Sequence, residues 1–212
     1  MKTTYIDMDN WNRKEHFQYF NKFTYPHFSI CANLDITKYY KYIKEQDIPF
    51  FVSFTYLASK AANEIPEFRQ RIREDKVIEH ELVSPSFTVM TESKLFSYCA
   101  VDYIDDFSVF KAHAQENMEK VKKNITLEDE PDRDDLLYIT SIPWISFTSM
   151  VSPIQMNPVD SIPRISWGKY FEENERMKLP LSVQIHHALA DGLHVGEYFN
   201  TLQELLQHPI YE

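Results

Sequence analysis

The sequence predicts an α/β protein, a two-layer α+β sandwich in which helices cover a largely antiparallel mixed sheet. Three observations predict this class. Helical periodicity and strand-like alternation follow one another in the first half, and the second half is mostly strand-like. Hydrophobic residues make up 43% of the chain, which is enough for a substantial core. The chain has only three glycines, too few to build a glycine-rich phosphate loop.

Helices and strands are expected in turn through the first half. Asn10 can cap a short helix over residues 11–23. The helix expected over residues 50–63, which Pro66 ends, is nearly apolar on several sides and is therefore expected to pack deeply. The pair Glu74-Asp75 indicates the turn of a hairpin over residues 69–79. The other expected elements are strands over residues 28–36, 86–90 and 95–102 and helices over residues 36–46 and 106–124.

Strand signals dominate the second half. Strands are expected over residues 137–141, 145–150, 164–170 and 179–187. The acidic segment 127–135 is expected to be a solvated loop. A last helix over residues 191–207 presents one broad apolar face, made of Val195, Tyr198, Phe199, Leu202, Leu205 and Leu206.

Charge and composition argue against several classes of function. The formal net charge is −10, whereas a nucleic-acid partner needs a basic face on the protein. No apolar run approaches the roughly 20 residues that span a membrane, and the first residues lack the apolar core of a signal peptide. Cys31 and Cys99 are too few for a disulfide scaffold. We therefore expect one soluble, cytoplasmic domain over residues 1–212.

The most informative stretch is His-His-Ala-Leu-Ala-Asp-Gly at residues 186–192, between a strand and a helix. A histidine at a strand end can act as a general base at neutral pH, because its ordinary pKa lies near 6.5. Successive strand residues point to opposite faces, so only one of His186 and His187 can line a given cleft. Two structural alternatives remain open: His186 as a packed strand-end residue and Asp191 as a helix cap.

A metal site in this stretch would draw on His186, His187, Asp191 and His194. The two adjacent strand histidines diverge, and no acidic residue that would orient them is evident. No metal is therefore expected.

The pattern His-His-x-x-x-Asp-Gly also marks CoA-dependent acyltransferases. Over nearly its whole length the chain resembles one family of them, the chloramphenicol acetyltransferases. Besides residues 184–195, the matching segments are residues 11–17 (Trp-Asn-Arg-Lys-Glu-His-Phe), 66–69 (Pro-Glu-Phe-Arg), 84–89 (Ser-Pro-Ser-Phe-Thr-Val) and 143–149 (Pro-Trp-Ile-Ser-Phe-Thr-Ser).

The resemblance implies a catalytic set. His187, the second histidine of the pair, would take the proton from a substrate hydroxyl, which attacks the thioester carbonyl of acetyl-CoA directly. Thr140 stands where the family has a serine whose hydroxyl stabilises the oxyanion of the tetrahedral intermediate. Asp191 would be a structural partner of Arg13, and breaking this pair should misplace the loop that carries His187.

The resemblance also implies ligand contacts and an assembly. Acetyl-CoA would be a co-substrate rather than a permanently bound cofactor. Family members are homotrimers whose active sites lie between subunits, with the histidine of one chain facing an acceptor pocket mostly from its neighbour. Trp144, Tyr170, Ser166 and Lys169 match positions on the CoA side, Ser166 as the holder of a water and Lys169 near the phosphates. Tyr19, Phe20, Phe28 and Phe96 match aromatic walls on the acceptor side.

The acceptor side departs from the family pattern. Pro26 replaces a cysteine, Ser152 replaces a leucine, and the usual Phe-Pro-x-Gly turn is absent. The expected function is acetyl-CoA-dependent O-acetylation of a hydroxyl of chloramphenicol, an acyltransferase activity of EC class 2.3.1 linked to antibiotic resistance. The alternatives are acetyl transfer to another hydroxyl or thiol acceptor and non-catalytic, trimeric binding of hydrophobic ligands.

Overall fold

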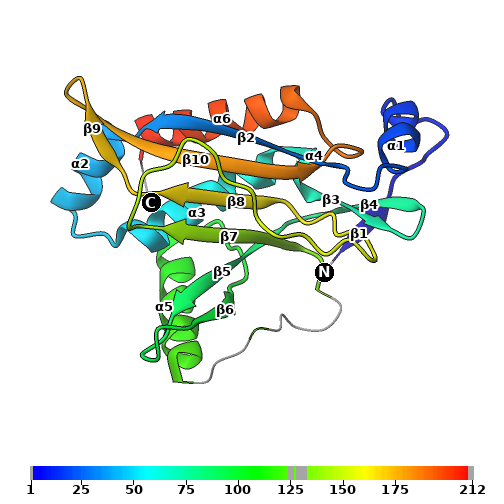
Figure 1. Cartoon of the computed structure of the whole chain (residues 1–212). Helices are drawn as coiled ribbons and strands as arrows, with labels where there is room; N and C mark the ends of the chain where they lie inside the picture. The colour runs from blue at the N-terminus through cyan, green and yellow to red at the C-terminus, as the bar shows by residue number, and fades with distance from the viewer. Residues whose placement is uncertain (1, 124–126, 128–132, 210–212) are drawn as a thin grey trace.

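The computed structural model describes residues 2–123, 127 and 133–209. These residues form a seven-stranded mixed sheet with helices against it, so the predicted fold class is confirmed (Figure 1). The strands are β2 (His27–Asp35), β5 (Ser84–Met90), β6 (Phe96–Ala100), β7 (Leu136–Ile142), β8 (Arg164–Gly168), β9 (Phe171–Glu173) and β10 (Arg176–His186). Their order is β2-β10-β8-β7-β5-β6, with β9 also paired to β10. The β5–β7 and β7–β8 pairs are parallel, and the other pairs are antiparallel.

A second, three-stranded sheet lies at the side of the molecule where the chain begins, in the order β1-β4-β3 (Figure 1). It consists of β1 (Thr3–Tyr5), β3 (Gln70–Arg73) and β4 (Lys76–His80). The predicted hairpin corresponds to β3 and β4. The fully buried Arg71 of β3 donates to the Leu136 carbonyl at 2.6 Å and so fastens this small sheet to β7.

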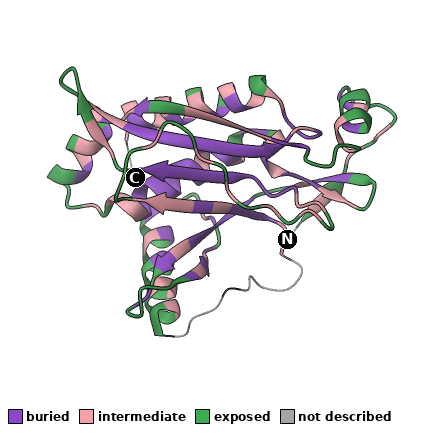
Figure 2. Cartoon of the chain, viewed as in Figure 1, coloured by how far each residue is buried: buried purple, intermediate pink, exposed green. Residues whose placement is uncertain are grey.

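Most of the helices lie on one face of the large sheet, whereas α1 lies at the side of the molecule near the small sheet (Figure 1). The described residues contain α1 (Lys14–Phe20), α2 (Thr37–Glu45), α3 (Phe50–Glu64), α4 (Pro66–Arg69), α5 (Phe107–Lys123) and α6 (Gly192–Gln207). Helix α3 is buried along most of its length, as its apolar sequence predicts, and it contacts both α5 and α6. Burial is concentrated between these helices and the central strands (Figure 2). Within the described residues, no helix combines the length and apolarity needed to cross a membrane.

The two faces of the large sheet differ in chemistry because side chains alternate along each strand. Ile139, Ile165 and Val183 belong to the core beneath the helices. On the other face, Thr140 of β7 lies opposite Ser166 of β8, which in turn lies opposite Ser182 of β10. A row of hydroxyl side chains therefore crosses three neighbouring strands.

The segment 143–163 covers part of this polar face, and the strand predicted over residues 145–150 is wrong. The segment is held by side chains instead of a strand ladder. The hydroxyls of Ser29 and Ser182 each donate to the Met150 carbonyl at 3.0 Å, and the Ser152 N–H donates to the Gln184 side chain at 2.8 Å. A pattern of alternating residues does not distinguish a strand from an extended segment whose backbone bonds to side chains.

The other differences concern short elements and one loop. The helix predicted over residues 11–23 is restricted to α1, while β1, β9 and α4 are too short for a periodic signal. Of the expected solvated loop 127–135, residues 128–132 lie outside the described residues. Its end is not solvated: Asp134 accepts from Arg73 at 2.7 Å, and Asp135 is buried against Arg133. The ion pairs offset the cost of burying these carboxylates.

Gly168, the last residue of β8, has no room for a side chain. A Cβ there would lie 2.9 Å from the Ile145 carbonyl oxygen and 2.9 Å from a Phe147 ring atom. We expect Gly168→Ala to lower the free energy of unfolding by about 1–3 kcal/mol, because segment 143–163 must move away. Gly196→Ala in α6 is the control: nothing lies within 4 Å of its Cβ, and the change should stabilise the helix by about 0.5–1 kcal/mol. Urea unfolding of both variants measures this, and equal stability of the two would contradict the crowding at Gly168.

Candidate active site

His187 follows the last residue of β10 and lies among aromatic side chains. Its ring stacks on Phe20, with ring centroids 3.9 Å apart and planes 4° from parallel, and lies 4.5 Å from the ring of Phe28. The buried His186 instead packs edge-on against His27 at 4.9 Å. The two histidines of the pair therefore have different surroundings, as strand alternation predicts.

The surroundings of His187 leave one of its two ring nitrogens, Nε2, able to contact a substrate. The His187 N–H donates to the Pro26 carbonyl at 2.8 Å. Nδ1 is buried and has no hydrogen-bond partner among the described residues. A buried Nδ1 cannot meet a substrate, so Nε2 is the ring nitrogen that can exchange a proton with one.

Arg13, the residue before α1, ties the loop after β10 to the N-terminal region. Its guanidinium donates to Asp191 Oδ2 at 2.7 Å and to the His187 carbonyl at 3.0 Å. A small apolar cluster of Phe17, Ala188, Leu189 and Val77 packs beneath this loop. The contact expected between Arg13 and Asp191 is thus present, and Arg13 also bonds directly to the residue that carries the candidate base.

Asp191 caps α6 while it binds Arg13. Its Oδ1 accepts from the Leu193 N–H at 3.0 Å, so it is both the helix cap and the ion-pair partner. Burial alone would raise the pKa of Asp191, but the hydrogen bonds from Arg13 and Leu193 outweigh it and hold the pKa below its usual range. Asp191 is therefore ionised at neutral pH, as the pair with Arg13 requires.

The buried histidines beside the candidate base should make the fold sensitive to acid. Burial lowers the pKa of His27 to about 4, with the charge of Arg164 adding to the effect, and lowers the pKa of His186 to about 3. Between these values and the ordinary value near 6.5, the unfolded chain binds protons that the folded chain excludes. The free energy of unfolding should therefore fall as the pH drops below about 6.5.

For His27 alone we expect a loss of about 2 kcal/mol in unfolding free energy between pH 7 and pH 5. Urea unfolding at both pH values measures it, with His27→Leu as the comparison, because leucine removes the titrating group. The variant should show a smaller loss than the wild type. Equal losses would show that His27 does not contribute.

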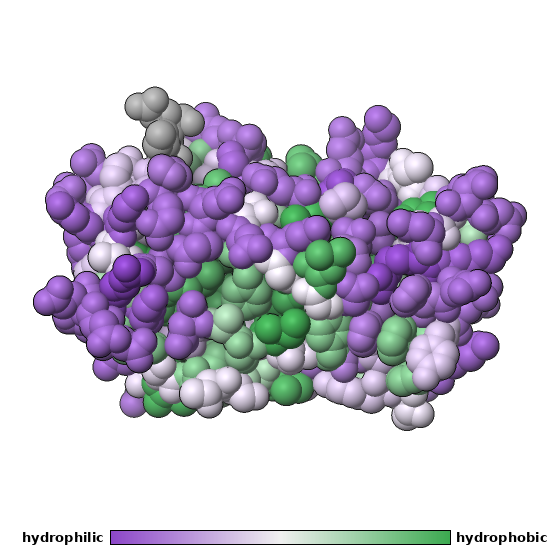
Figure 3. Space-filling model, turned by 90° about the horizontal axis from the view of Figure 1, so that it is seen from above, coloured by the Kyte–Doolittle hydropathy of each residue, from purple (hydrophilic) through white to green (hydrophobic). Residues whose placement is uncertain are grey.

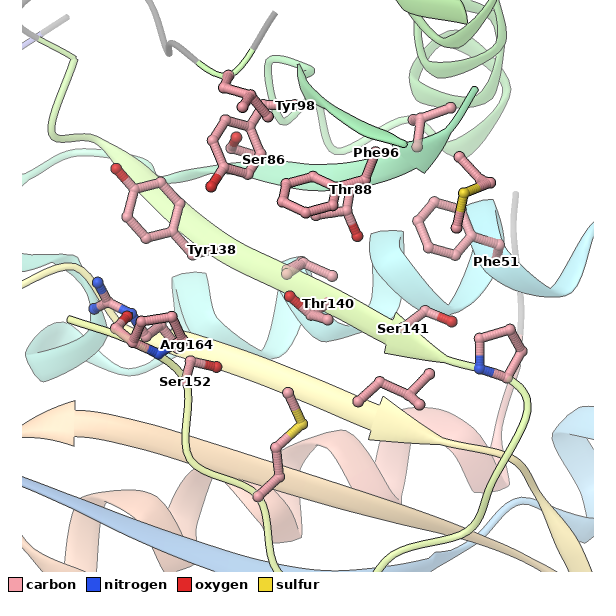
Figure 4. A pocket seen from close by; sticks show the side chains of 18 of the residues that line it. Phe51, Ser86, Thr88, Phe96, Tyr98, Tyr138, Thr140, Ser141, Ser152 and Arg164 are labelled. Atoms are coloured by element: carbon pink, nitrogen blue, oxygen red, sulfur yellow. The ribbon is translucent and has the colours of Figure 1, made fainter. Parts of the chain in front are cut away.

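Thr140 lines a pocket with a volume of about 840 Å³ on the polar face of the large sheet (Figure 4). The Thr140 side chain lies on β7 between the labelled Tyr138 and Ser141, with Thr88 and Phe96 from the neighbouring strands across the pocket (Figure 4). Apolar side chains, including Phe51, Val89, Met118 and Met150, form much of the remaining wall. The pocket thus offers a hydroxyl row beside an apolar surface, which suits a ligand with both kinds of group.

Of the residues expected on the CoA side, Trp144 follows the end of β7, Lys169 and Tyr170 follow the end of β8, and Ser166 lies within β8. Trp144 lines the pocket and is 67% exposed. The Lys169 N–H donates to the carbonyl of Ile145, the residue after Trp144, at 2.7 Å. Tyr170 packs against Tyr40 with ring centroids 5.1 Å apart. Ser166 is 3% exposed and lies beside Thr140 on the neighbouring strand. In a single chain it is therefore covered, and its neighbour Thr140 is the residue that lines the pocket.

The residues expected on the acceptor side divide between two places. Phe96 lines the pocket, whereas Phe20 and Phe28 pack on His187, and Tyr19 packs on Phe20 at 5.0 Å. Ser152 also lines the pocket, and Pro26 lies beside His187.

Within one chain, His187 and Thr140 are too far apart to act on the same atoms. Thr140 lies opposite Ser166, which lies opposite Ser182, and His186 is four residues further along β10. Strand geometry makes the distance between the Cα atoms of Thr140 and His186 about 16 Å. A base and an oxyanion donor must each approach the reacting group to about 3 Å. The candidate site is therefore present in one chain as two separate parts.

Two residues of the pocket wall were not identified from the sequence. Tyr138 and Arg164 line the pocket, with the guanidinium 5.3 Å from the centroid of the tyrosine ring. Strand alternation places Tyr138 on the same face as Thr140, so Tyr138 could have been predicted as a pocket residue. Among the described residues, no group of three His, Cys, Asp or Glu side chains is arranged to hold a metal ion.

Comparisons with known proteins agree on one family. The family model for chloramphenicol acetyltransferase matches residues 1–203. Chloramphenicol acetyltransferase 3 of Escherichia coli is 34% identical over 207 residues, covering 97% of each chain. Chloramphenicol acetyltransferase 2 of Haemophilus influenzae is 35% identical over 205 residues, covering 96% of each.

Solved structures agree with this relationship. A chloramphenicol acetyltransferase structure superimposes with a TM-score of 0.84 at 27% identity, covering 97% of this chain and all of the other. A probable dihydrolipoamide acetyltransferase from Listeria monocytogenes has the same fold, with a TM-score of 0.69 at 17% identity over 92% of this chain and 89% of its own. By sequence and by structure, this chain belongs to the chloramphenicol acetyltransferase family.

Proposed function

We propose that this protein is an acetyl-CoA-dependent O-acetyltransferase that acetylates a hydroxyl of chloramphenicol, with His187 as the general base. The observation that carries the proposal is the setting of His187. Its ring stacks on Phe20 and packs against Phe28, its Nδ1 is buried, and its backbone is held by Arg13 and Pro26. A histidine held in this way presents Nε2 in one orientation, which a base in proton transfer requires.

In the proposed reaction, His187 Nε2 takes the proton from the acceptor hydroxyl as its oxygen attacks the carbonyl carbon of the acetyl thioester. The new carbon–oxygen bond gives a tetrahedral intermediate with a negative oxygen. The carbon–sulfur bond then breaks, and the CoA sulfur leaves with the proton that His187 received. The products are the O-acetylated acceptor and CoA, and the histidine returns to its neutral form.

The Thr140 hydroxyl is proposed to donate a hydrogen bond to that negative oxygen. Its location in the wall of the pocket, on an ordered strand with Ser166 beside it, supports this role. A donor on a strand needs little rearrangement when the charge develops, which is the condition for strong transition-state stabilisation.

We further propose a homotrimer in which each active site combines His187 of one chain with the Thr140 pocket of the next. The separation of about 16 Å within one chain supports this assembly, because the two residues meet only if they come from different copies. Exposed apolar surface supports it as well: Tyr19 is 61% exposed next to Phe20, and hydrophobic surface crosses the middle of the molecule between hydrophilic flanks (Figure 3).

The finer assignments follow from the same proposal. Trp144, Tyr170 and Lys169 would contact acetyl-CoA, a co-substrate that is released after each turnover, and Ser166 would order a water near the negative oxygen. Residues 1–212 would form one domain. Use of acetyl-CoA and two free cysteines, Cys31 and Cys99, fit a cytoplasmic location.

A second candidate function is acetyl transfer to a different hydroxyl or thiol acceptor. It is favoured by polar groups in the pocket wall: Ser152, Tyr138 and Arg164. The Arg164 guanidinium is already engaged, since it donates to the Ile162 carbonyl at 2.9 Å and to Asp160. These groups could select an acceptor with more polar substituents than chloramphenicol carries.

An acetyl-transfer assay distinguishes the two candidates. Release of CoA from acetyl-CoA is followed with a thiol reagent, with and without chloramphenicol, and then with a panel of alcohol acceptors. Thiol acceptors are assayed by chromatography, because they react with the reagent themselves. The first proposal expects chloramphenicol-dependent release. Turnover with another acceptor but none with chloramphenicol would overturn it in favour of the second.

A further inference from the structure

Two residues outside the proposed catalytic set, Glu67 and His194, connect a separate helix to the loop of the candidate base. His194 is the third residue of α6, three positions after Asp191. Glu67 lies on α4, the short helix between α3 and the small sheet. Their side chains are mostly buried, with 14% of His194 and 20% of Glu67 exposed, and neither has a part in the reaction as written above.

His194 completes the cap at the start of α6. The Asp191 N–H donates to His194 Nδ1 at 3.1 Å, while the Asp191 side chain accepts from the Leu193 N–H. In most capping boxes a Glu or Gln side chain occupies the position of His194 and accepts this bond. An imidazole accepts a hydrogen bond only through an unprotonated nitrogen, so this geometry requires that Nδ1 carry no proton.

Glu67 favours the form of His194 that this bond requires. When Nδ1 carries no proton, the proton of the neutral ring is on Nε2, and His194 Nε2 lies 3.5 Å from Glu67 Oε1. The negative carboxylate stabilises the tautomer with its proton on the facing nitrogen. The opposite tautomer would turn an unprotonated nitrogen toward the Glu67 carboxylate and an N–H toward the Asp191 N–H. Its one favourable contact would be from Nδ1–H to Asp191 Oδ1, 3.1 Å away, an oxygen that already accepts from the Leu193 N–H.

The position of Asp191 matters because it is shared with Arg13. Asp191 Oδ1 lies 3.1 Å from His194 Nδ1, and its Oδ2 accepts from Arg13, which also binds the His187 carbonyl. A proton on Nδ1 would leave the Asp191 N–H without its acceptor. It would also draw the Asp191 carboxylate toward the His194 ring and away from Arg13, which binds both Asp191 and the His187 carbonyl. A change at His194 is therefore passed to the backbone of His187 through Asp191 and Arg13.

We propose that Glu67 and His194 are positioning residues: Glu67 holds His194 in the tautomer whose Nδ1 accepts the Asp191 N–H, and this fixes the loop that carries His187. The inference rests on the proposed function of His187, but it makes a claim about the tautomer of His194 that is measured without any turnover. Because these residues touch neither substrate in the proposed reaction, they should affect kcat and leave KM nearly unchanged.

The test combines kinetics with a double-mutant cycle. Glu67→Gln has nearly the same shape but no charge, and it should lower kcat about tenfold with little change in KM for acetyl-CoA or the acceptor. His194→Gln should keep most of the activity, because a Gln side chain at this position accepts the same bond and has no tautomers, whereas His194→Leu should lose it. In the His194→Gln background, Glu67→Gln should have no further effect on kcat.

Two further measurements separate positioning from a general loss of structure. Glu79→Gln removes a carboxylate 2.9 Å from Arg69 of the same α4 and should leave kcat unchanged. Nitrogen-15 NMR of the histidine rings reports which nitrogen of His194 carries the proton. The wild type should show it on Nε2, and Glu67→Gln should show a larger share on Nδ1.

Three results would overturn the proposal. One is an equal fall in kcat on Glu67→Gln with and without His194→Gln. Another is a fall that Glu79→Gln reproduces. The third is a His194 proton on Nδ1 in the wild type. If the wild type transfers no acetyl group to any acceptor, the proposed function fails, and the NMR result still decides the state of His194.

Discussion

Replacement of His187 by Gln is expected to lower kcat for acetyl transfer by about 10²- to 10⁴-fold, the usual contribution of a general base. Glutamine approximates the size of the ring and keeps a polar end, but it takes up no proton near neutral pH. Without a base, the acceptor hydroxyl must attack while it is still protonated. Binding of both substrates should change much less than kcat, because the apolar wall of the pocket is intact in this variant.

The assay compares initial rates of CoA release for the wild type and His187→Gln, with His113→Gln as the matched control. His113 lies exposed on α5, so the same chemical change there should have no effect on the rate. If His187→Gln kept more than about a tenth of the wild-type kcat, His187 would not be the base. Unchanged ligand binding together with no turnover in the wild type would favour the third possibility, a trimeric binder of hydrophobic molecules.

Replacement of Thr140 by Val is expected to lower kcat by about 10²- to 10³-fold, the effect of losing one donor to the oxyanion. Valine has the shape of threonine with a methyl group in place of the hydroxyl, so the pocket keeps its volume. Thr140→Ser is the control, because it keeps the hydroxyl and should retain most of the activity. A Thr140→Val enzyme as active as Thr140→Ser would show that the negative oxygen is stabilised elsewhere.

The two inactive variants together test whether the sites lie between copies. In a mixed trimer of His187→Gln and Thr140→Val chains, some interfaces combine the intact His187 of one chain with the intact Thr140 of its neighbour. Random mixing of equal amounts should restore about a quarter of the wild-type activity. One interface in about four pairs the His187 of a Thr140→Val chain with the Thr140 of a His187→Gln chain, and that site has both residues. The mixture must be co-expressed or refolded together. No recovery in trimers shown to be mixed would contradict the shared site.

The sequence determined much of the fold and the position of the candidate base. The periodic segments predicted α3, α6 and the long strands nearly to their ends, because an apolar face repeats at the spacing of each structure. Strand alternation separated His186 from His187, and the wider resemblance identified Arg13, Thr140 and Asp191. Helices α3 and α6, the long strands and the Arg13–Asp191 contact are present as expected, because each depends on local spacing or on a matched segment of the chain. The catalytic roles of His187 and Thr140 stay predictions.

Only the tertiary structure decided how these residues are brought together. It placed segment 143–163 across the polar face without a strand, because hydroxyls of Ser29 and Ser182 bind its backbone at Met150. Ser29 is more than a hundred positions away from Met150 in the sequence. It joined Arg13 to the His187 carbonyl as well as to Asp191, and it put Glu67 against His194. It also separated His187 from Thr140: His187 follows β10 and Thr140 lies on β7, two strands that β8 separates, and the end of β10 lies four residues beyond the position opposite Thr140. Distances of this kind depend on strand order and register, which the packing of the whole sheet sets and which no local pattern in the sequence encodes.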